Sequence, residues 1–436
     1  MTDATLRNTV PLADTDHALH MPDYTAHPFL DPELFHRDRN ARRYFHRLFR
    51  DHLRNDWHYG QLLNRLLHPL GEEHSIETNE QILASYLADA SQYVRELLQI
   101  LPPNARQQLL PDAEVVRANN LRDLASFLFR PGQGDPCTRR IRQFEAQRKL
   151  YLTKLLLQIE NVRMVQDGPR HRSYLNDLLD RELFSHVVET RDWSAHYRVG
   201  ADGHAVVVDS ADDPQSSEFW QFHVRRIRRQ LPGGNYDLEI FHADTRFKRE
   251  TAGYAYEPGR DHYEVVEAGR YGDMKRSRSA SILSKMLRKG INDPALISDM
   301  LGVKFIVAQE KHVHQLVELL HQVLGGPFFF RNQIDLFRRP SDRAQLNPFS
   351  APDFKVFKED IDLLYPARGS GRASAYSFSV ELQILTVDSF LRTLQRGDYV
   401  SHRVYKTRQF LRGVMPYVFP IEMYPLPDLS ELLIPM

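Results

Sequence analysis

The sequence of 436 residues contains a single cysteine, Cys137. One thiol cannot form an internal disulfide or a cysteine-based zinc site. The two residues on either side of it include no histidine that could activate the sulfur as a nucleophile. Cys137 is therefore expected to be an ordinary structural thiol.

Long apolar runs and net charge are also lacking. Nowhere do eighteen apolar residues follow one another, and residues 1–30 carry no apolar segment of the signal-peptide kind. We therefore expect a cytoplasmic protein without a membrane partner. Lys+Arg and Asp+Glu both total 57, so charge has to be examined segment by segment rather than for the whole molecule.

The chain is long enough for two or three domains, and its 42% apolar content can fill their cores. Residues 1–30 are expected to form a flexible N-terminus. Residues 31–180 are rich in Leu, Arg and His with apolar residues at helical spacing, for example at Leu152, Leu155, Leu156 and Ile159, and predict a helical accessory domain. Proline and glycine at 102–103, 111 and 130–134 are expected to separate its helices.

Beyond residue 181 the pattern changes. Residues 181–233 are interpreted as a connecting region with a short strand at 205–208 and a basic amphipathic helix at 218–230. In residues 234–436, strand patterns alternate with helix patterns. Strands are expected at 236–241, 303–308, 328–336, 354–364 and 377–385. Helices are expected at 279–289, 311–324 and 388–412. The expected fold is mixed α/β, an N-terminal helical domain followed by a mixed sheet flanked by helices.

The densest basic segment lies at residues 275–290, at the start of the helix expected at 279–289. Lys275, Arg276, Arg278 and Lys285 alternate there with small and hydroxyl residues such as Ser281. Helix N-termini and Lys or Arg side chains both favour phosphate oxygens. The segment predicts a polyphosphate site, although a solvated basic helix would have the same composition.

Two carboxylates follow on neighbouring expected strands. Asp299 stands at the entrance of an apolar strand, and Glu381 alternates with Val380 and Leu382 so that it faces the other side of its strand. Magnesium accepts one or two protein carboxylates together with phosphate oxygens and water. Asp299 and Glu381 are thus candidate Mg²⁺ ligands, while a helix or turn cap and a solvated strand position remain the alternatives.

Four short motifs occur in a characteristic order: Ser-Ile-x-x-Lys-Met at 281–286, Asp-x-x-Gly-Val-Lys-Phe-Ile-Val at 299–307, Val-Glu-Leu-Gln-Ile-Leu-Thr at 380–386 and His-x-x-Tyr-Lys at 402–406. Together they resemble the RelA/SpoT alarmone synthetase domain, a nucleotidyltransferase-like fold. The resemblance implies Mg²⁺-dependent transfer of a pyrophosphoryl group from ATP to the 3′-hydroxyl of GDP or GTP, giving guanosine tetra- or pentaphosphate.

The same resemblance implies roles for individual residues. Asp299 and Glu381 would be catalytic and hold Mg²⁺, and Glu381 could also accept the proton of the 3′-hydroxyl. The nucleotides would contact the remaining residues of the motifs and their surroundings, namely Lys275, Arg276, Arg278, Ser281, Lys285, Lys304, Phe354, Lys358, Gln383, His402 and Lys406.

Four positions depart from the family pattern, in three places. Ser277 replaces a basic residue, Phe354 and Lys358 occupy the places of a tyrosine and a histidine at the acceptor base, and Leu385 replaces an arginine. Phenylalanine can still stack on a base but lacks the hydroxyl. Two alternatives therefore stay open: a toxin-like relative that modifies adenine nucleotides or tRNA 3′ ends, and a catalytically silent nucleotide-sensing module.

No His-Asp dipeptide occurs in the chain, so the hydrolase of the family's longer members is not expected. The N-terminal region does contain histidines among arginines and aromatic residues. They could bind metal or RNA, since arginine clusters attract phosphates, but irregular spacing favours ordinary helix faces. If this helical domain binds a partner, the expected partner is a tRNA or a regulatory protein. The histidines considered are His36, His46, His52, His58 and His68.

Overall fold

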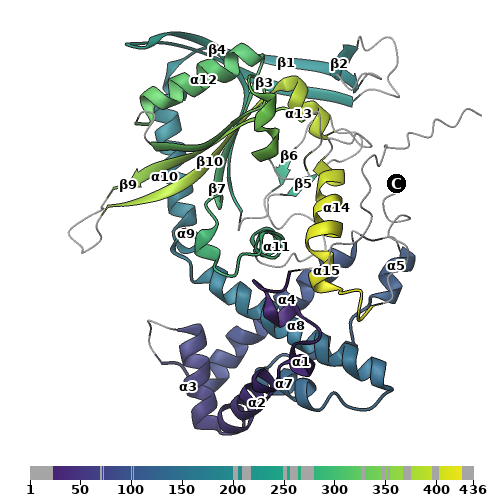
Figure 1. Ribbon diagram of the computed structural model, residues 1–436. Coiled ribbons are helices and arrows are strands. Elements are labelled where there is room, and N and C mark those ends of the chain that lie inside the picture. The colour runs from purple at the N-terminus through teal and green to yellow at the C-terminus, as the bar shows by residue number, and fades with distance from the viewer. Residues whose placement is uncertain are drawn as a thin grey trace, which may run out of the picture.

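A computed structural model describes most of the chain between residues 23 and 424. The described residues are 23–68, 71, 73–99, 101, 103–199, 205–208, 218–248, 253–255, 264–266, 279–325, 329–345, 350, 354–366, 375–394 and 402–424. A helical region is followed by a mixed sheet with helices on both faces (Figure 1). The predicted mixed α/β fold is confirmed.

The helical region extends from residue 34 to residue 182. Its helices are α1 (Leu34–Arg37), α2 (Arg39–Leu48), α3 (Asp56–Leu67), α4 (Ile76–Gln99), α5 (Pro103–Gln108), α6 (Ala113–Arg117), α7 (Leu121–Phe129), α8 (Pro136–Glu160), α9 (Arg163–Gln166) and α10 (Gly168–Glu182). The breaks predicted at proline 111 and at 130–134 fall between helices, because α5 ends before the first and α7 ends before the second. Among the described helices, none has both the length and the hydropathy required to cross a bilayer.

The sheet contains eight strands in the described part of the chain, in the order β2-β1-β3-β4-β7-β10-β9-β8. All its neighbours are antiparallel except β7 and β10, which are parallel at the centre. Strands β5 and β6 form a separate antiparallel pair. The bounds are β1 (Val187–Val199), β2 (Ala205–Val208), β3 (Glu218–Leu231), β4 (Gly234–Phe247), β5 (Gly253–Ala255), β6 (Glu264–Val266), β7 (Leu301–Val307), β8 (Phe330–Asp335), β9 (Phe357–Tyr365) and β10 (Tyr376–Thr386).

The prediction of a helix at residues 218–230 is wrong, because this segment is strand β3. Trp220, Phe222 and Val224 are buried while the residues between them are exposed, which is the period of two that a strand requires. The arginines that suggested a basic helix lie between β1 and β4, where Arg226 forms a bidentate ion pair with Asp237 of β4 at 2.7 and 2.8 Å. The connecting region therefore contributes strands to the main sheet.

The other predicted elements of the C-terminal half are present with small shifts in their ends, except that the strand predicted at 236–241 continues to Phe247 as β4. The helix predicted at 388–412 corresponds to two helices, α13 (Val387–Leu394) and α14 (His402–Gly413), and the residues between them lie outside the described part. The remaining helices are α11 (Ala280–Lys289), α12 (Glu310–Val323) and α15 (Met415–Val418).

Helices α10 and α12 cover one face of the sheet. Tyr236 of β4 accepts a hydrogen bond from Gln322 of α12 at 2.5 Å, and Thr245 of β4 donates to Asn176 of α10 at 2.7 Å. Helices α11, α13 and α14 lie on the side of the opposite face (Figure 1). The central strands thus present one face to α10 and α12 and the other toward α11 and α14.

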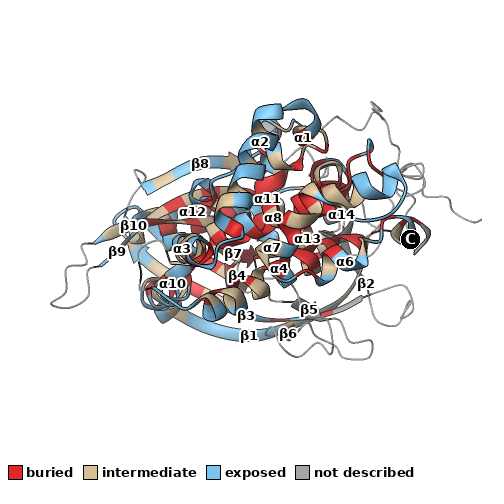
Figure 2. Ribbon diagram, turned by 90° about the horizontal axis from the view of Figure 1, so that it is seen from below, coloured by how far each residue is buried: buried red, intermediate tan, exposed pale blue. Residues whose placement is uncertain are grey.

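The helical region makes direct contacts with α11 and α15. Tyr93 of α4 hydrogen-bonds Ser284 of α11 at 2.8 Å. Arg148 of α8 donates to the carbonyl oxygen of Val418 at the end of α15 at 2.5 Å. Buried residues concentrate in α8 and α11, whereas β1 is largely exposed (Figure 2). The N-terminal helices therefore share a core with the sheet region.

Residues 23–30 were expected within a flexible terminus, but they are packed. His27 is fully buried, and its ring nitrogens contact the Tyr151 hydroxyl at 2.9 Å and the Met286 carbonyl oxygen at 3.1 Å. Leu30 is buried in the same core. This segment therefore links α8 to α11.

Candidate active site

A row of charged and polar side chains crosses the second face of the central strands. In the register of the sheet, Asp244 of β4 lies opposite Lys304 of β7, Lys304 opposite Gln383 of β10, and Gln383 opposite Lys358 of β9. Directly opposed residues in a sheet place their side chains on the same face. Four strands therefore bring these residues together, although they are up to 139 positions apart in the sequence.

The next row contains a glycine at its centre. Arg246 of β4 lies opposite Gly302 of β7, and Gly302 opposite Glu381, which in turn lies opposite Asp360 of β9. A Cβ atom at position 302 would stand 3.3 Å from the carbonyl oxygen of Glu381. Glycine therefore permits the close approach of β7 and β10 and leaves the space between Arg246 and Glu381 free of a side chain.

Asp299 occupies the turn that leads into β7, where its carboxylate is nearly buried. Its Oδ2 atom forms ion pairs with the amino groups of Lys248 and Lys285. Burial would raise the pKa of Asp299, but the two lysines lower it well below its usual value. Asp299 is thus held as a carboxylate between two cations.

Local structure explains how these three side chains meet. Lys248 follows β4, and its backbone N–H donates to the carbonyl oxygen of Met300 at 2.9 Å, which extends the pairing of β4 with β7 by one step. Lys285 lies on α11, whose residues Ile282 and Met286 are fully buried and orient the helix. A strand end and a helix therefore deliver one lysine each to Asp299.

Glu381 is held by a second set of partners. Gln383 donates to its Oε2 atom at 2.6 Å, and the amino group of Lys358 lies 3.5 Å from its Oε1 atom. Burial alone would lower the pKa of Lys358, but Glu381 first, then Tyr405 and Asp299, raise it above the ordinary value. Lys358 thus lies within the field of both candidate carboxylates.

Tyr405 connects the third and fourth motifs. Burial raises its pKa, Lys358 and Arg288 counteract this shift, and Glu381 and Asp299 add to it. Helix α14, which carries Tyr405, contacts α11. The His-x-x-Tyr-Lys motif therefore faces the two carboxylates through its tyrosine.

Lys304 lies opposite Asp244 and Gln383, one row further along β7 than the row that contains Glu381. Burial, followed by the charge of Arg246, lowers its pKa to about 8, while Asp244 partly opposes the shift. Burial and Lys248 likewise lower the pKa of Lys285 to about 8, against the influence of Asp299. A cation that is poorly compensated in its site is ready to gain an anionic ligand.

The carboxylates suit the predicted Mg²⁺. The Oδ1 atom of Asp299 is buried and has no hydrogen-bond partner among the described residues, whereas Oδ2 carries both lysines. A buried carboxylate oxygen without a partner is costly unless a cation or donor satisfies it. Glu381 on the adjacent strand could supply a second oxygen in exchange for its contact with Lys358. Phosphate oxygens would complete the hard, oxygen-only set that Mg²⁺ prefers.

The other predicted residues differ in what the structure says of them. Ser281 is exposed on the first turn of α11. Phe354 packs against an apolar cluster that includes Leu385, so two of the positions that depart from the family pattern belong to the same cluster. His402 and Lys406 belong to α14, but their side chains, like all of Lys275, Arg276 and Arg278, lie outside the described part. Their nucleotide-binding roles stay predictions.

The residues missed by the sequence analysis are Lys248, Arg246, Asp360 and Arg288, together with Asp244. Alternation offered one signal, because Asp244, Arg246 and Lys248 recur every second residue at the end of a predicted strand. Lys358 and Asp360 repeat that pattern in β9. Arg288 carried no such signal, since it is one of several cations on α11.

No protein-family model matches this chain, and no curated protein matches it. Among solved structures, small alarmone synthetase 1 from Bacillus subtilis bound to its product pppGpp is similar at 16% identity, over 33% of this chain and 70% of that chain, with a TM-score of 0.21. Small alarmone synthetase 2 from Bacillus subtilis is similar at 16% identity, over 41% of this chain and 76% of that chain, with a TM-score of 0.23. A GTP pyrophosphokinase family protein from Streptococcus pneumoniae is similar at 16% identity, over 33% of this chain and 68% of that chain, with a TM-score of 0.20. The motifs resemble the same class of synthetase. At these TM-scores the likeness does not indicate what this chain does.

Proposed function

We propose that this protein is a Mg²⁺-dependent nucleotide pyrophosphokinase that transfers the pyrophosphoryl group of ATP to the 3′-hydroxyl of a guanine nucleotide. One observation carries the proposal: two carboxylates, Asp299 in the turn before β7 and Glu381 in the middle of the parallel neighbouring strand β10, lie among four lysines. Phosphoryl-transfer enzymes need little more than positioned anions for a metal, cations for phosphates and one base. The four lysines are Lys248, Lys285, Lys304 and Lys358.

In this reaction the acceptor 3′-oxygen bonds to the β-phosphorus of ATP, the bond from that phosphorus to the α,β-bridging oxygen breaks, and AMP leaves. Glu381 would take the proton of the 3′-hydroxyl, since Gln383 at 2.6 Å orients its carboxylate. Lys248 and Lys285 would turn from Asp299 to the phosphates, and Lys304 and Lys358 would neutralise charge at the transferred group. Bound Mg²⁺ would supply further neutralisation of the phosphates at Asp299 and Glu381.

The acceptor is the least constrained part of the proposal. Phe354, at the position expected to stack on the acceptor base, is only partly buried. Leu385, where the family has an arginine, is buried in the same apolar cluster and cannot contact phosphate. The acceptor site thus lacks the family's arginine, while Lys358 stands where the family has a histidine. Adenine nucleotides and tRNA 3′ ends are therefore the competing acceptors.

The test incubates the full chain with Mg²⁺ and γ-labelled ATP beside GDP, GTP, AMP, ADP or bulk tRNA, and follows the label by chromatography. Label on a guanine nucleotide is expected, with a loss of about 10²- to 10⁴-fold in Glu381→Gln, the size of a general-base contribution. Glu318→Gln, an exposed carboxylate on α12 over the other face, is the matched control and should keep full activity.

Two other results would change the conclusion. Label on AMP, ADP or tRNA alone would replace the acceptor and keep the chemistry. Calorimetric binding of ATP with no transfer to any acceptor would overturn the enzyme and leave a nucleotide-sensing module.

A further inference from the structure

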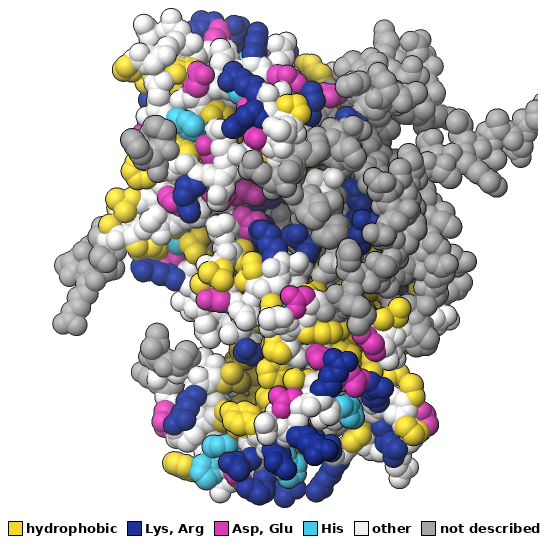
Figure 3. Space-filling model, in the orientation of Figure 1, with side chains coloured by type: hydrophobic (Ala, Val, Ile, Leu, Met, Phe, Trp, Pro, Cys, Tyr) yellow, Lys and Arg dark blue, Asp and Glu magenta, His cyan; other side chains and the backbone are white. Residues whose placement is uncertain are grey.

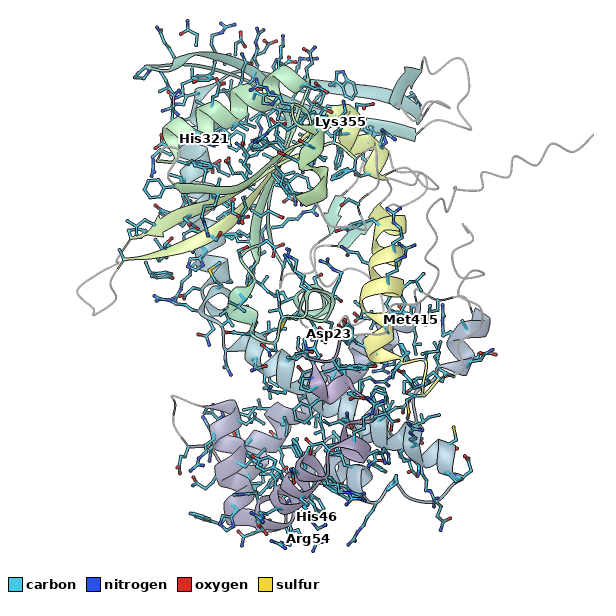
Figure 4. The ribbon with its side chains drawn as sticks, viewed as in Figure 1. Asp23, His46, Arg54, His321, Lys355 and Met415 are labelled. Atoms are coloured by element: carbon cyan, nitrogen blue, oxygen red, sulfur yellow. The ribbon has the colours of Figure 1, made fainter. Side chains whose placement is uncertain are left out.

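The far end of the helical region carries an exposed arginine-rich surface that the candidate active site does not use. Arg39, Arg42, Arg43 and Arg47 recur along α2 at spacings of three and four residues, so they share one face of the helix. All four are exposed. Cations gather at this lower end of the molecule together with histidines (Figure 3), and His46 and Arg54 both lie there (Figure 4).

The charge of this surface is not compensated locally. None of the four arginines forms an ion pair with a residue that the structure describes. The nearby acids are engaged elsewhere, because Asp38 accepts the backbone N–H groups of residues 40 and 41 as the cap of α2, Asp51 pairs with Arg50 at 2.6 Å, and Asp56 pairs with Arg122 at 2.5 Å. A surplus of guanidinium groups therefore faces solvent and attracts a polyanion.

Two exposed aromatic rings lie on the same stretch of chain, one on α2 and one at the start of α3, which the short helix Phe49–Leu53 joins to α2. Tyr44 of α2 is 63% exposed and Trp57 of α3 is 69% exposed, although rings of this size are normally covered. The rings of Trp57 and His58 meet edge to face with centroids 5.0 Å apart, and His58 meets His52 in the same way. Exposed rings beside arginines are the combination on which unpaired bases stack while their phosphates are bound.

We propose that this α2–α3 surface, made of Arg39, Arg42, Arg43, Tyr44, Arg47 and Trp57, binds single-stranded RNA. Arginine is the only basic residue other than histidine between positions 36 and 58, and its planar fork fits phosphate oxygens and stacks on bases in a way that lysine does not. Successive arginines four residues apart are separated by about 6 Å along the helix, so several can contact one strand. RNA is the nucleic acid that presents unpaired bases in loops and ends.

Other partners fit less well. An interfacial membrane helix needs an outward apolar face, but Phe45, Leu48 and Phe49 of this segment are turned away from solvent, and the two phenylalanines pack onto the helical core. An acidic protein would satisfy the arginines without using the two exposed rings. The surface lies at the end of the helical region opposite the sheet, so it requires neither the nucleotide chemistry nor the carboxylates of the candidate active site.

The test measures fluorescence anisotropy of a labelled 20-nucleotide single-stranded RNA with the full chain over a series of salt concentrations. The variant Arg42→Ala/Arg43→Ala/Arg47→Ala should weaken binding about tenfold or more and lower the slope of log K against log salt by about 2, since each phosphate contact on a single strand contributes about 0.7. The matched control removes three arginines that are also exposed but lie on α10 and β3, Arg170, Arg181 and Arg228, and should leave both quantities unchanged.

Stacking is tested separately from charge. Trp57→Ala should weaken binding by roughly tenfold without altering the salt slope, and Trp57→Phe should restore most of it, because a base stacks on either ring. Circular dichroism confirms that the variants are folded. Three outcomes would each overturn the proposal. The triple variant could bind RNA as tightly as the wild type, or polyglutamate or duplex RNA could displace the labelled strand as effectively as single-stranded RNA does. The third is that the chain binds only to anionic vesicles. None of these outcomes bears on pyrophosphate transfer.

Discussion

On the face of the sheet covered by α10 and α12, β7 presents Val303 and Phe305, and on the opposite face it presents Gly302 and Lys304. Charges occur on both faces, but their partners differ. On the first face Glu359 is buried and pairs one to one with His321 at 2.8 Å. On the second, Asp299 shares one oxygen between two lysines and leaves the other without a partner in the described residues.

This difference between the two faces distinguishes residues that stabilise the fold from residues that act on a ligand. A buried group whose hydrogen bonds are complete contributes to the fold and gains nothing from a ligand. Lysines with lowered pKa and a carboxylate oxygen without a partner are instead better satisfied when metal and phosphate arrive. Substitutions on the first face should therefore change stability alone, and those on the second should change activity alone.

The largest expected effect on the first face is that of Phe305→Ala. Phe305 is fully buried between β4 and β10, so truncating it should lower the free energy of unfolding by about 3–5 kcal/mol through lost burial and a cavity. Urea unfolding measures this, and the KM for ATP should stay within about twofold at a temperature where the variant is folded.

Leu364→Ala is its control, because Leu364 of β9 is 61% exposed and its truncation should cost less than about 0.5 kcal/mol. A change in KM as large in Phe305→Ala as in the lysine variants below would show that the two faces are not independent.

The sequence predicted the central strands and the two carboxylates because short-range signals encode them. Apolar residues at every second position set which face Glu381 takes, and this period also identifies β7 and β10. The misassigned segment at 218–230 failed because its four arginines suggested a solvated helix, whereas cross-strand pairing with β1 and β4 accommodates them. Tertiary pairing overrode local composition there.

Lys248 shows what sequence alone cannot reach. It lies 51 positions from Asp299, and only the antiparallel pairing of β4 with β7 brings it to that carboxylate. Lys285, by contrast, belongs to a dense basic motif that precedes Asp299 by 14 residues and was identified without the sheet. A contact between two strands can be predicted only when their pairing register is known, and the periodicity of one strand does not specify which strand pairs with it.

Lys248→Ala should therefore have a strong effect on activity. Removing one charge-assisted contact should lower kcat/KM for ATP by about tenfold or more, whereas stability should change little because Lys285 still pairs with Asp299. Initial rates and urea unfolding give the two numbers. Lys289→Ala, an exposed cation on the same helix as Lys285, should behave as wild type, and activity of Lys248→Ala within twofold of wild type would remove Lys248 from the site.

The smallest effect concerns the pH dependence of ATP binding. Because burial and Arg246 lower the pKa of Lys304 to about 8, this lysine is charged at pH 7 and progressively loses its proton as the pH rises through 8 to 9. A bound polyphosphate favours the charged form, so binding and protonation are coupled. The KM for ATP should consequently rise several-fold, by about tenfold at most per pH unit and group, between pH 7 and pH 9.

Lys304→Arg keeps its charge over this range, since guanidinium does not lose its proton in proteins. Its KM profile should be flatter than that of the wild type, although some slope should remain because Lys285 also has a pKa of about 8. The profile is measured at saturating acceptor, with the pKa of ATP itself outside the range. Identical slopes in both proteins would mean that Lys304 keeps its proton between pH 7 and pH 9. The positive charge of Lys304 would then be better compensated by nearby anions than its lowered pKa implies.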